Sequence, residues 1–332
     1  MKKRCFLHLG LHKTASSSAQ ATFRSSKHML RECNIEFPIF KYIQSGSKVK
    51  HISNHSIPIL SLFSDNPSQY HVNKRWGVTG LDETNASYLK QLIGAVNSGR
   101  DILLSGEGIS MLSTTGMRRF TSLINDLGFD IYAFALVRTP YSFACSAIQT
   151  NVKGGAYIQW LDDSVEHTND KGTLMLPARS GILSNLIDHF GDSLKLMSFS
   201  EAISHQHGPV GYMVEHMQLC RPSDLTYVRR NNSMGNRWIR AKNISNGYFT
   251  GEILVRTSEA QGLKATTLFA NDSKKFLLTE HEFKKIEPEL VSESNAMKKL
   301  MGSTFTENEY EFAIPLTAQD WKLIYLETLA SR

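Results

Sequence analysis

Apolar runs of strand length recur along this chain, and segments of helical pattern separate them. The runs cover residues 5–9, 102–104, 131–137 and 194–199. Their apolar residues are continuous rather than alternating, which is typical of strands buried on both faces of a parallel sheet. Strands that alternate with helices predict an α/β fold with helices on both faces of the sheet. We therefore expect a three-layer α/β/α sandwich with a mainly parallel central sheet.

Apolar positions at helical spacing mark the segments between these strands. They fall within residues 19–33, 89–96, 117–127 and 182–190. Gly128 and Gly191 follow the last two segments and are placed to end those helices.

Two stretches, residues 34–84 and 229–275, interrupt this rhythm and are rich in polar residues. Long spans without periodicity are usually functional excursions or disorder. Because the chain has no internal repeat and no low-complexity linker, we expect a single domain over residues 1–332 with these two excursions inserted. Residues 279–301 have a helical pattern that Pro288 interrupts.

The composition is that of a globular protein with a mild excess of positive charge. The 332 residues include 41% hydrophobic and 20% charged residues, and the net charge is +6. This excess suits an anionic ligand, but it is spread along the chain, and no run of Lys and Arg is dense enough to indicate nucleic-acid binding. The apolar run after the basic residues 1–4 is too short for a secretory signal, and no stretch approaches the ~18 apolar residues of a membrane span. The four cysteines are isolated, which is typical of reduced thiols rather than of a zinc site. We therefore expect a cytoplasmic protein without a membrane span.

The first candidate site is the loop that follows residues 5–9 and leads into a helical pattern. A helix start offers backbone N–H groups and a positive dipole end, and Lys13 adds a formal charge, so the loop suits a phosphate. The residues expected to bind it are His12, Lys13, Thr14, Ala15, Ser16, Ser17 and Ser18. The loop is not a Walker A motif, because His12 precedes Lys13 and the nearest glycine is Gly10. The alternative is an ordinary strand–turn–helix with a Ser-rich N-cap.

The second candidate is Arg138, which follows the predicted strand at residues 131–137. Pro140 is well placed in the first turn of the next helix, and Ser146 comes eight residues after Arg138. An arginine at a strand end can bind a phosphate with two parallel hydrogen bonds. The alternative is an arginine in a surface ion pair, with the serine on a solvent-facing side of the helix.

The third candidate is Glu107, which lies between Gly106 and Gly108 at the end of the predicted strand at residues 102–104. Ligands of open α/β sheets bind at the carboxyl ends of the strands, so this carboxylate is placed to act as a general base. The alternative is a glutamate that only stabilises a helix start through the dipole.

The order of these three motifs resembles the family of sulfotransferases that use 3′-phosphoadenosine 5′-phosphosulfate (PAPS). Residues 12–18, H-K-T-A-S-S-S, resemble the H-K-T-G-T-T loop of bacterial sulfotransferases, although Ala15 stands where the family usually has glycine. The resemblance covers roughly residues 4–235 and implies a P-loop-like fold. It implies that the loop binds the 5′-phosphosulfate, that Arg138 and Ser146 bind the 3′-phosphate, and that Glu107 is the catalytic base.

Shorter segments extend the resemblance. They lie at residues 35–38, 54–56, 157–160 and 190–199. Arg230, Asn231 and Ser233 resemble an R-x-N-x-S segment that contacts the cofactor in the family. Ala15 departs from the family, which usually has glycine at this position. If the position needs a positive φ, alanine is strained there, whereas glycine is not.

The resemblance implies a sulfuryl transfer from PAPS to an acceptor hydroxyl, in line, with PAP as the product. Glu107 would take the hydroxyl proton, and Lys13 would stabilise the charge that grows on the leaving phosphate. No metal is required in this mechanism. His51 and His55 are rival bases and candidate substrate contacts, and Lys74, Arg75 and Trp76 suit a sugar or an acidic glycan as the acceptor.

Two other functions remain open from the sequence. A P-loop kinase for small molecules shares the phosphate loop, but it would need a glycine before Lys13 and a strand-end aspartate for Mg²⁺. The second function is that of a non-catalytic protein that kept the fold and binds a glycan or an anion. Ala15 is the residue that favours this function. The sequence names neither the acceptor nor the oligomeric state.

Overall fold

The computed structural model describes residues 2–44, 48–161, 178–231, 233–250, 275–307 and 309–330. Their contacts group the chain into two compact units. The first consists of Met1–Arg138, Arg179–Asn231 and Leu300–Thr306, and the second of Thr139–Ala178, Asn232–Lys299 and Glu307–Arg332. A single domain over the whole chain therefore stays a prediction, and each unit is described by itself.

The first unit is built on a five-stranded sheet with the order β2–β5–β1–β6–β7. The strands are β1 (Lys3–His8), β2 (Ile35–Glu36), β5 (Asp101–Ser105), β6 (Phe129–Val137) and β7 (Leu194–Ser198). All neighbouring pairs in this sheet are parallel. The predicted α/β class and the mainly parallel central sheet are confirmed, and the four apolar runs form β1, β5, β6 and β7.

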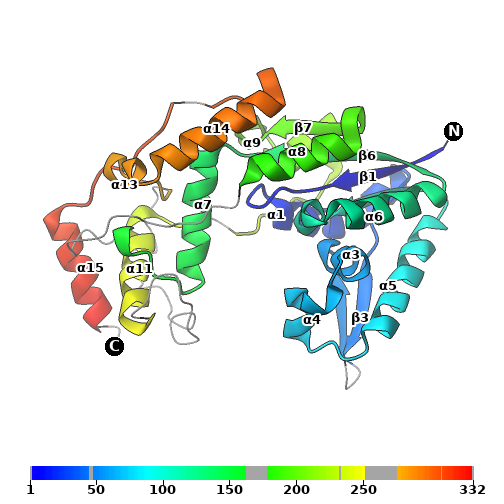
Figure 1. Cartoon of the computed structure of the whole chain (residues 1–332), viewed down its shortest axis with the longest axis horizontal. Coiled ribbons are helices and arrows are strands. Elements are labelled where there is room, and N and C mark those ends of the chain that lie inside the picture. The colour runs from blue at the N-terminus through cyan, green and yellow to red at the C-terminus, as the bar shows by residue number, and fades with distance from the viewer. Residues whose placement is uncertain are drawn as a thin grey trace. The chain divides into compact units, whose positions relative to one another are not determined.

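Helices of this unit pack against the sheet (Figure 1). Its described helices are α1 (Ser16–Ser25), α2 (Lys27–Glu32), α3 (Ser56–Phe63), α4 (His71–Trp76), α5 (Leu81–Val96), α6 (Thr114–Asp126), α8 (Arg179–Phe190), α9 (Phe199–Ser204) and α10 (Gly208–His216). Of these, α1, α2, α5, α6, α8 and α9 contact strands of the central sheet. Short 3₁₀ turns are η1 (Pro67–Gln69), η2 (Glu107–Met111), η4 (Gly191–Ser193), η5 (Pro222–Asp224) and η7 (Gly302–Thr304). Gly128, at φ 88°, and Gly191, at φ 50°, follow α6 and α8 in the left-handed conformation, as the sequence predicts.

Alternate residues of the strands point to opposite faces of the sheet. Phe6, Leu103 and Phe134 join one buried cluster with residues of α1, α9 and α10. Leu7 and Leu104 are equally buried and point to the other face, where α5 and α6 pack against β5 and β6. Helices on both faces explain the continuous apolar runs and are compatible with three layers.

The predicted excursion at residues 34–84 has regular structure of its own. Strands β3 (Phe40–Gln44) and β4 (Lys48–Ile52) form an antiparallel two-stranded sheet. Gln91 of α5 binds the backbone of β3. Its side chain accepts a hydrogen bond from the N–H of Lys41 at 2.7 Å and donates one to the carbonyl of Lys41 at 3.0 Å. Figure 1 shows this hairpin beside α4, with α3 next to them.

The second unit is helical. Its elements are α7 (Pro140–Lys153), η3 (Gln159–Leu161), α11 (Asn236–Thr250), α13 (Glu280–Lys284), α14 (Glu287–Met301) and α15 (Ala318–Ala330). Pro140 begins α7 and Pro288 lies in the first turn of α14, so both prolines take positions where the missing N–H costs nothing. Of the second predicted excursion, α11 covers residues 236–250, and Asn232 and residues 251–274 lie outside the described residues.

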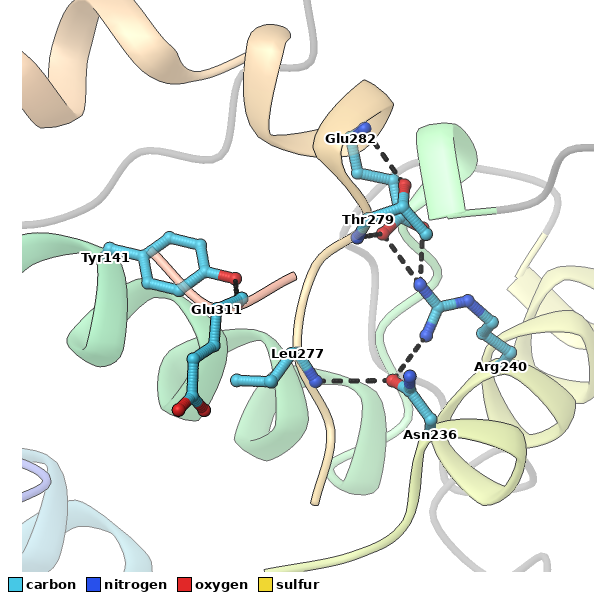
Figure 2. A network of polar contacts seen from close by, with 7 residues as sticks. All are labelled: Tyr141, Asn236, Arg240, Leu277, Thr279, Glu282 and Glu311. Carbon is cyan, nitrogen blue, oxygen red and sulfur yellow. Dashed lines mark hydrogen bonds and ion pairs between the residues drawn. The ribbon is translucent and has the colours of Figure 1, made fainter. Parts of the chain in front are cut away.

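A buried ion pair ties α11 to α13 in this unit (Figure 2). The guanidinium of Arg240 donates to both carboxylate oxygens of Glu282, at 2.8 and 2.7 Å, and the two side chains are only 2% and 1% exposed. Arg240 also donates to Asn236 at 2.8 Å, and Glu282 completes a capping box with Thr279 at the start of α13. Buried charges need such complete pairing, so this network is structural.

Candidate functional site

The carboxyl ends of β1, β5 and β6 meet at one edge of the central sheet. His8, the last residue of β1, lies opposite Ser105 of β5 and Phe134 of β6. The pairing with β6 continues past β1, because the N–H of Leu136 donates to the carbonyl of Gly10 at 3.0 Å. Strands β2 and β5 lie on one side of β1, and β6 and β7 lie on the other. After β1 the chain forms the first pair and then crosses to form the second, so the strand order reverses at β1. Ligands of open α/β sheets bind outside the strand ends at such a point.

The loop between β1 and α1 contains two non-glycine residues in the left-handed conformation. Lys13 has φ 67° and Ala15 has φ 66°. Each costs of order 1 kcal/mol relative to an ordinary conformation, and such strain is concentrated at functional sites. Ala15 is the N-cap of α1, and within the described residues no side chain caps this helix start. The alternative of an ordinary Ser-rich N-cap does not fit this geometry, and the positive φ expected at position 15 is present.

Three of the loop hydroxyls are hydrogen-bonded within the protein. The Thr14 hydroxyl is fully buried and donates to the carbonyl of Leu11, and Ser16 donates to the same carbonyl at 3.4 Å. Ser18 accepts from the backbone N–H of Arg230 at 3.0 Å. These three hydroxyls bond protein backbone in this structure, and their contact with a phosphate stays a prediction. Ser17 is exposed.

Three hydroxyls on α1 and its C-cap hold residues 226–230 against the helix. Ser18, Thr22 and Ser26 accept hydrogen bonds of 3.0, 3.0 and 2.8 Å from the backbone N–H groups of residues 230, 228 and 226. Spacings of four residues on the helix thus match spacings of two in residues 226–230. This row keeps Arg230 next to the first turn of α1. The i, i+4, i+8 hydroxyls were visible in the sequence, but their partner was not.

Arg138 reaches from the end of β6 to the loop between β1 and α1. Its Nη1 donates to the carbonyl of Lys13 at 3.0 Å, and its guanidinium lies 4.9 Å from the ring centre of Phe199. The side chain is only 7% exposed, so the alternative of a surface ion pair is wrong. Ser146 is half-buried on α7 in the second unit, and its part in a 3′-phosphate site stays a prediction.

Glu107 is half-buried at the start of η2, directly after β5. Nε2 of Gln20 on α1 donates to its Oε2 at 3.0 Å. A Cβ placed on Gly10 would lie 2.7 Å from the Cα and Cβ of Glu107, so Gly10 is needed for this close approach. Neither Gln20 nor this role of Gly10 was signalled by the sequence.

His55 supports the strand ends and does not face a substrate. Its Nδ1 accepts from the N–H of Ser105 at 2.8 Å, and its Nε2 bonds the carbonyl of Pro38 at 2.7 Å. Its side chain has no exposed surface. Both ring nitrogens are occupied, which corrects the expectation that His55 is a rival base or a substrate contact. His51 is exposed on β4, opposite Lys41 in the hairpin.

Charged and polar groups around Glu107 influence one another. Desolvation lowers the pKa of His12. The negative charge of Glu107 opposes this change, whereas the positive charges of Arg179 and Lys13 add to it. Burial and the negative charge of Glu107 together raise the pKa of Tyr70 to about 12. His12 and Tyr70 are therefore neutral near pH 7 and lie within electrostatic reach of the carboxylate. Arg179, buried at the start of α8, and Tyr70 were both missed from the sequence.

No family model, curated protein or solved structure matches this chain. The resemblance to sulfotransferases therefore rests on the sequence motifs alone. Across the described ranges, no helix is long and apolar enough to cross a membrane.

We predict that Gly10→Ala destabilises the first unit and displaces Glu107. The new methyl group would meet backbone at 2.7 Å, and the φ of +92° strains alanine. Strain and overpacking together amount to about 2–4 kcal/mol of unfolding free energy. Gly99→Ala is a matched control, because Gly99 has φ +81° but nothing within 4 Å of its Cβ position, and we expect a loss of about 1 kcal/mol. Urea denaturation measures both, and equal losses would contradict the close contact with Glu107.

Buried histidines should make the protein less stable in mild acid. Burial lowers the pKa of His55 and of His8 from 6.5 to about 4. Between these two pH values the unfolded chain binds more protons than the folded protein does. The free energy of unfolding therefore falls as the pH falls from about 6.5 to about 4. Each histidine should remove about 2 kcal/mol of unfolding free energy between pH 7 and pH 5.

Urea denaturation at both pH values, on the natural chain and on His55→Gln, measures this effect. The variant should show the smaller drop between pH 7 and pH 5, even if it is less stable at pH 7. NMR titration of the His55 ring gives a second measurement that does not depend on the variant. A midpoint near the ordinary value would contradict the assignment of a neutral, doubly bonded ring.

Proposed function

We propose that this protein is a PAPS-dependent sulfotransferase that transfers a sulfuryl group to a hydroxyl of a carbohydrate or glycan. The observation that carries the proposal is the pairing of an uncapped, cationic helix start with a half-buried carboxylate from the adjacent strand end. In this proposal the fold is a three-layer α/β/α sandwich with a P-loop-like strand–loop–helix, and the enzyme is cytoplasmic.

The donor side of the proposed site is the loop and the start of α1. The first N–H groups of a helix have no partner within the helix, and the dipole attracts an anion to them. Lys13 and these N–H groups would bind the 5′-phosphosulfate, with the exposed Ser17 beside them. Arg138 would act in two ways, because it holds the carbonyl of Lys13 and can contribute charge to the nucleotide phosphates. A contact of Ser146 with the 3′-phosphate, which the resemblance implies, stays a prediction.

The acceptor side of the proposed site is Glu107. The acceptor hydroxyl gives its proton to the carboxylate as its oxygen bonds to sulfur. The bond between sulfur and the bridging phosphate oxygen breaks, and PAP leaves with the electron pair. Because Gln20 holds Oε2, we assign the proton to Oε1. Lys13 stabilises the charge on the leaving phosphate, and the reaction requires no metal.

The kinase alternative has less support. It needs an acid that holds Mg²⁺ beside the transferred phosphate, whereas the strand-end acid here is Glu107, which is held by an amide. The non-catalytic alternative depended on Ala15, yet Ala15 already has the left-handed conformation that a glycine would adopt easily.

We predict that PAP raises the melting temperature more than ATP with Mg²⁺ does. A 3′-phosphate gains contacts that a free 3′-hydroxyl cannot make. A ligand at 100 times its Kd adds about 2.7 kcal/mol of stability. Thermal-shift titrations with PAP, PAPS, ATP and GTP measure this effect. Equal or greater stabilisation by ATP would overturn the sulfotransferase proposal in favour of a kinase.

We predict that Glu107→Gln lowers kcat by about 10²- to 10⁴-fold, because glutamine cannot accept the hydroxyl proton. The Kd for PAP should change little, whereas Lys13→Ala should weaken PAP binding and also slow transfer. Transfer of radiolabelled sulfate from PAPS to a panel of saccharides measures the rate. Glu32→Gln, an exposed glutamate on α2, is the control. A nearly unchanged kcat for Glu107→Gln would remove Glu107 as the base.

A further inference from the structure

Positive charge is concentrated in the segment that forms the hairpin β3–β4, α3 and α4. Residues 37–80 contain four lysines and one arginine against one aspartate, a net charge of +4 out of the +6 of the whole chain. The aspartate, Asp65, pairs with Arg119 at 3.4 Å, outside this segment. The positive charge of the segment is therefore not neutralised from within.

An aromatic stack fixes one of these cations. Tyr42 of β3 stacks on Trp76 of α4, with ring centres 5.3 Å apart and planes 21° apart. Nζ of Lys50 on β4 lies 4.3 Å from the ring centre of Trp76. Such cation–π contacts hold an ammonium group in place without neutralising it. The hairpin and α4 are thereby joined around a positive charge.

Two exposed cations follow on α4. Lys74 and Arg75 lie in its last turn, next to Trp76, and Lys74 donates to the neutral amide of Gln69. In the described part of the chain, no carboxylate lies within ion-pair distance of Lys50, Lys74 or Arg75. The helix dipole favours cations at the end of α4, but it does not account for Lys50, which is on another element. All three cations lie on the hairpin or on α4, which the Tyr42–Trp76 stack joins, and their positive charges attract an anionic ligand.

This group of residues lies near the proposed base. Tyr70 immediately precedes α4, and its pKa responds both to the negative charge of Glu107 and to the positive charge of Arg75. The packing agrees, because α3 contacts η2, which begins with Glu107, and η1 contacts both α3 and α4. A chain of saccharide units that reaches Glu107 could therefore also reach these cations.

We propose that Lys50, Lys74 and Arg75, held by the Tyr42–Trp76 stack, form a binding surface for carboxylate or sulfate groups of an anionic saccharide. The surface would recognise the acceptor at units next to the one that is sulfated, so the proposal rests on the proposed function. Tyr42 and Lys50 already occupy ring surface of Trp76, which leaves ion pairing rather than base stacking as the main contact. This favours an anionic saccharide over single-stranded nucleic acid.

The test is fluorescence anisotropy with a labelled heparin octasaccharide in the presence of saturating PAP, which keeps the octasaccharide out of the phosphate loop. The double variant Lys74→Ala/Arg75→Ala should weaken binding about tenfold. Lys298→Ala/Lys299→Ala is the matched control, since it removes an adjacent exposed pair from the last turns of α14, and it should change Kd less than twofold. Neutral malto-octaose should not compete with heparin.

Three results would overturn this inference. They are an unchanged Kd in the Lys74/Arg75 variant, equal binding of malto-octaose, and tighter binding of an oligothymidylate of matched charge. Thermal shift with PAP on the same variant separates the two proposals, because the variant should keep the PAP shift of the natural chain. If PAP does not bind the natural chain, the proposed function fails, and the heparin titration without PAP still tests the surface.

Discussion

The parallel pairing of β1 with β5 on one side and β6 on the other determines where the candidate residues lie. Because all three strands run in the same direction, the residues that follow them emerge at one edge of the sheet. The loop that contains Lys13 follows β1, Glu107 follows β5, and Arg138 follows β6. Residues up to 125 positions apart, such as Lys13 and Arg138, can then be joined by one hydrogen bond.

The edge is held together by close backbone contacts and by buried polar side chains. Gly10 permits Glu107 to approach, and Ser56 accepts from the N–H of Gly108 at 2.8 Å. His55 bonds the N–H of Ser105 with one ring nitrogen and the carbonyl of Pro38 with the other. Since buried polar groups are costly unless paired, these contacts make the position of Glu107 rigid. A general base benefits from that rigidity, because its reach to the acceptor proton is short.

The loop stores strain that the surrounding contacts maintain. Lys13 and Ala15 both have positive φ, and polar side chains bond the loop backbone around them. Arg138 binds the carbonyl of Lys13, and Thr14 and Ser16 bind the carbonyl of Leu11. These polar side chains therefore shape the backbone of the candidate site.

Local sequence patterns predicted four of the five strands of the central sheet and the order in which they occur along the chain. Continuous apolar runs predicted β1, β5, β6 and β7, and Pro140, Gly128 and Gly191 predicted helix boundaries, because these signals depend on residues close together in the chain. The sequence also placed Lys13, Glu107 and Arg138 at strand ends. The roles of His55, Thr14 and Ser18 were decided by tertiary structure alone, since a histidine or a hydroxyl is equally suited to a ligand and to a backbone group. Gln20, Tyr70 and Arg179 join the site only because folding brings distant segments to Glu107, and no local pattern encodes which distant group a polar side chain will meet.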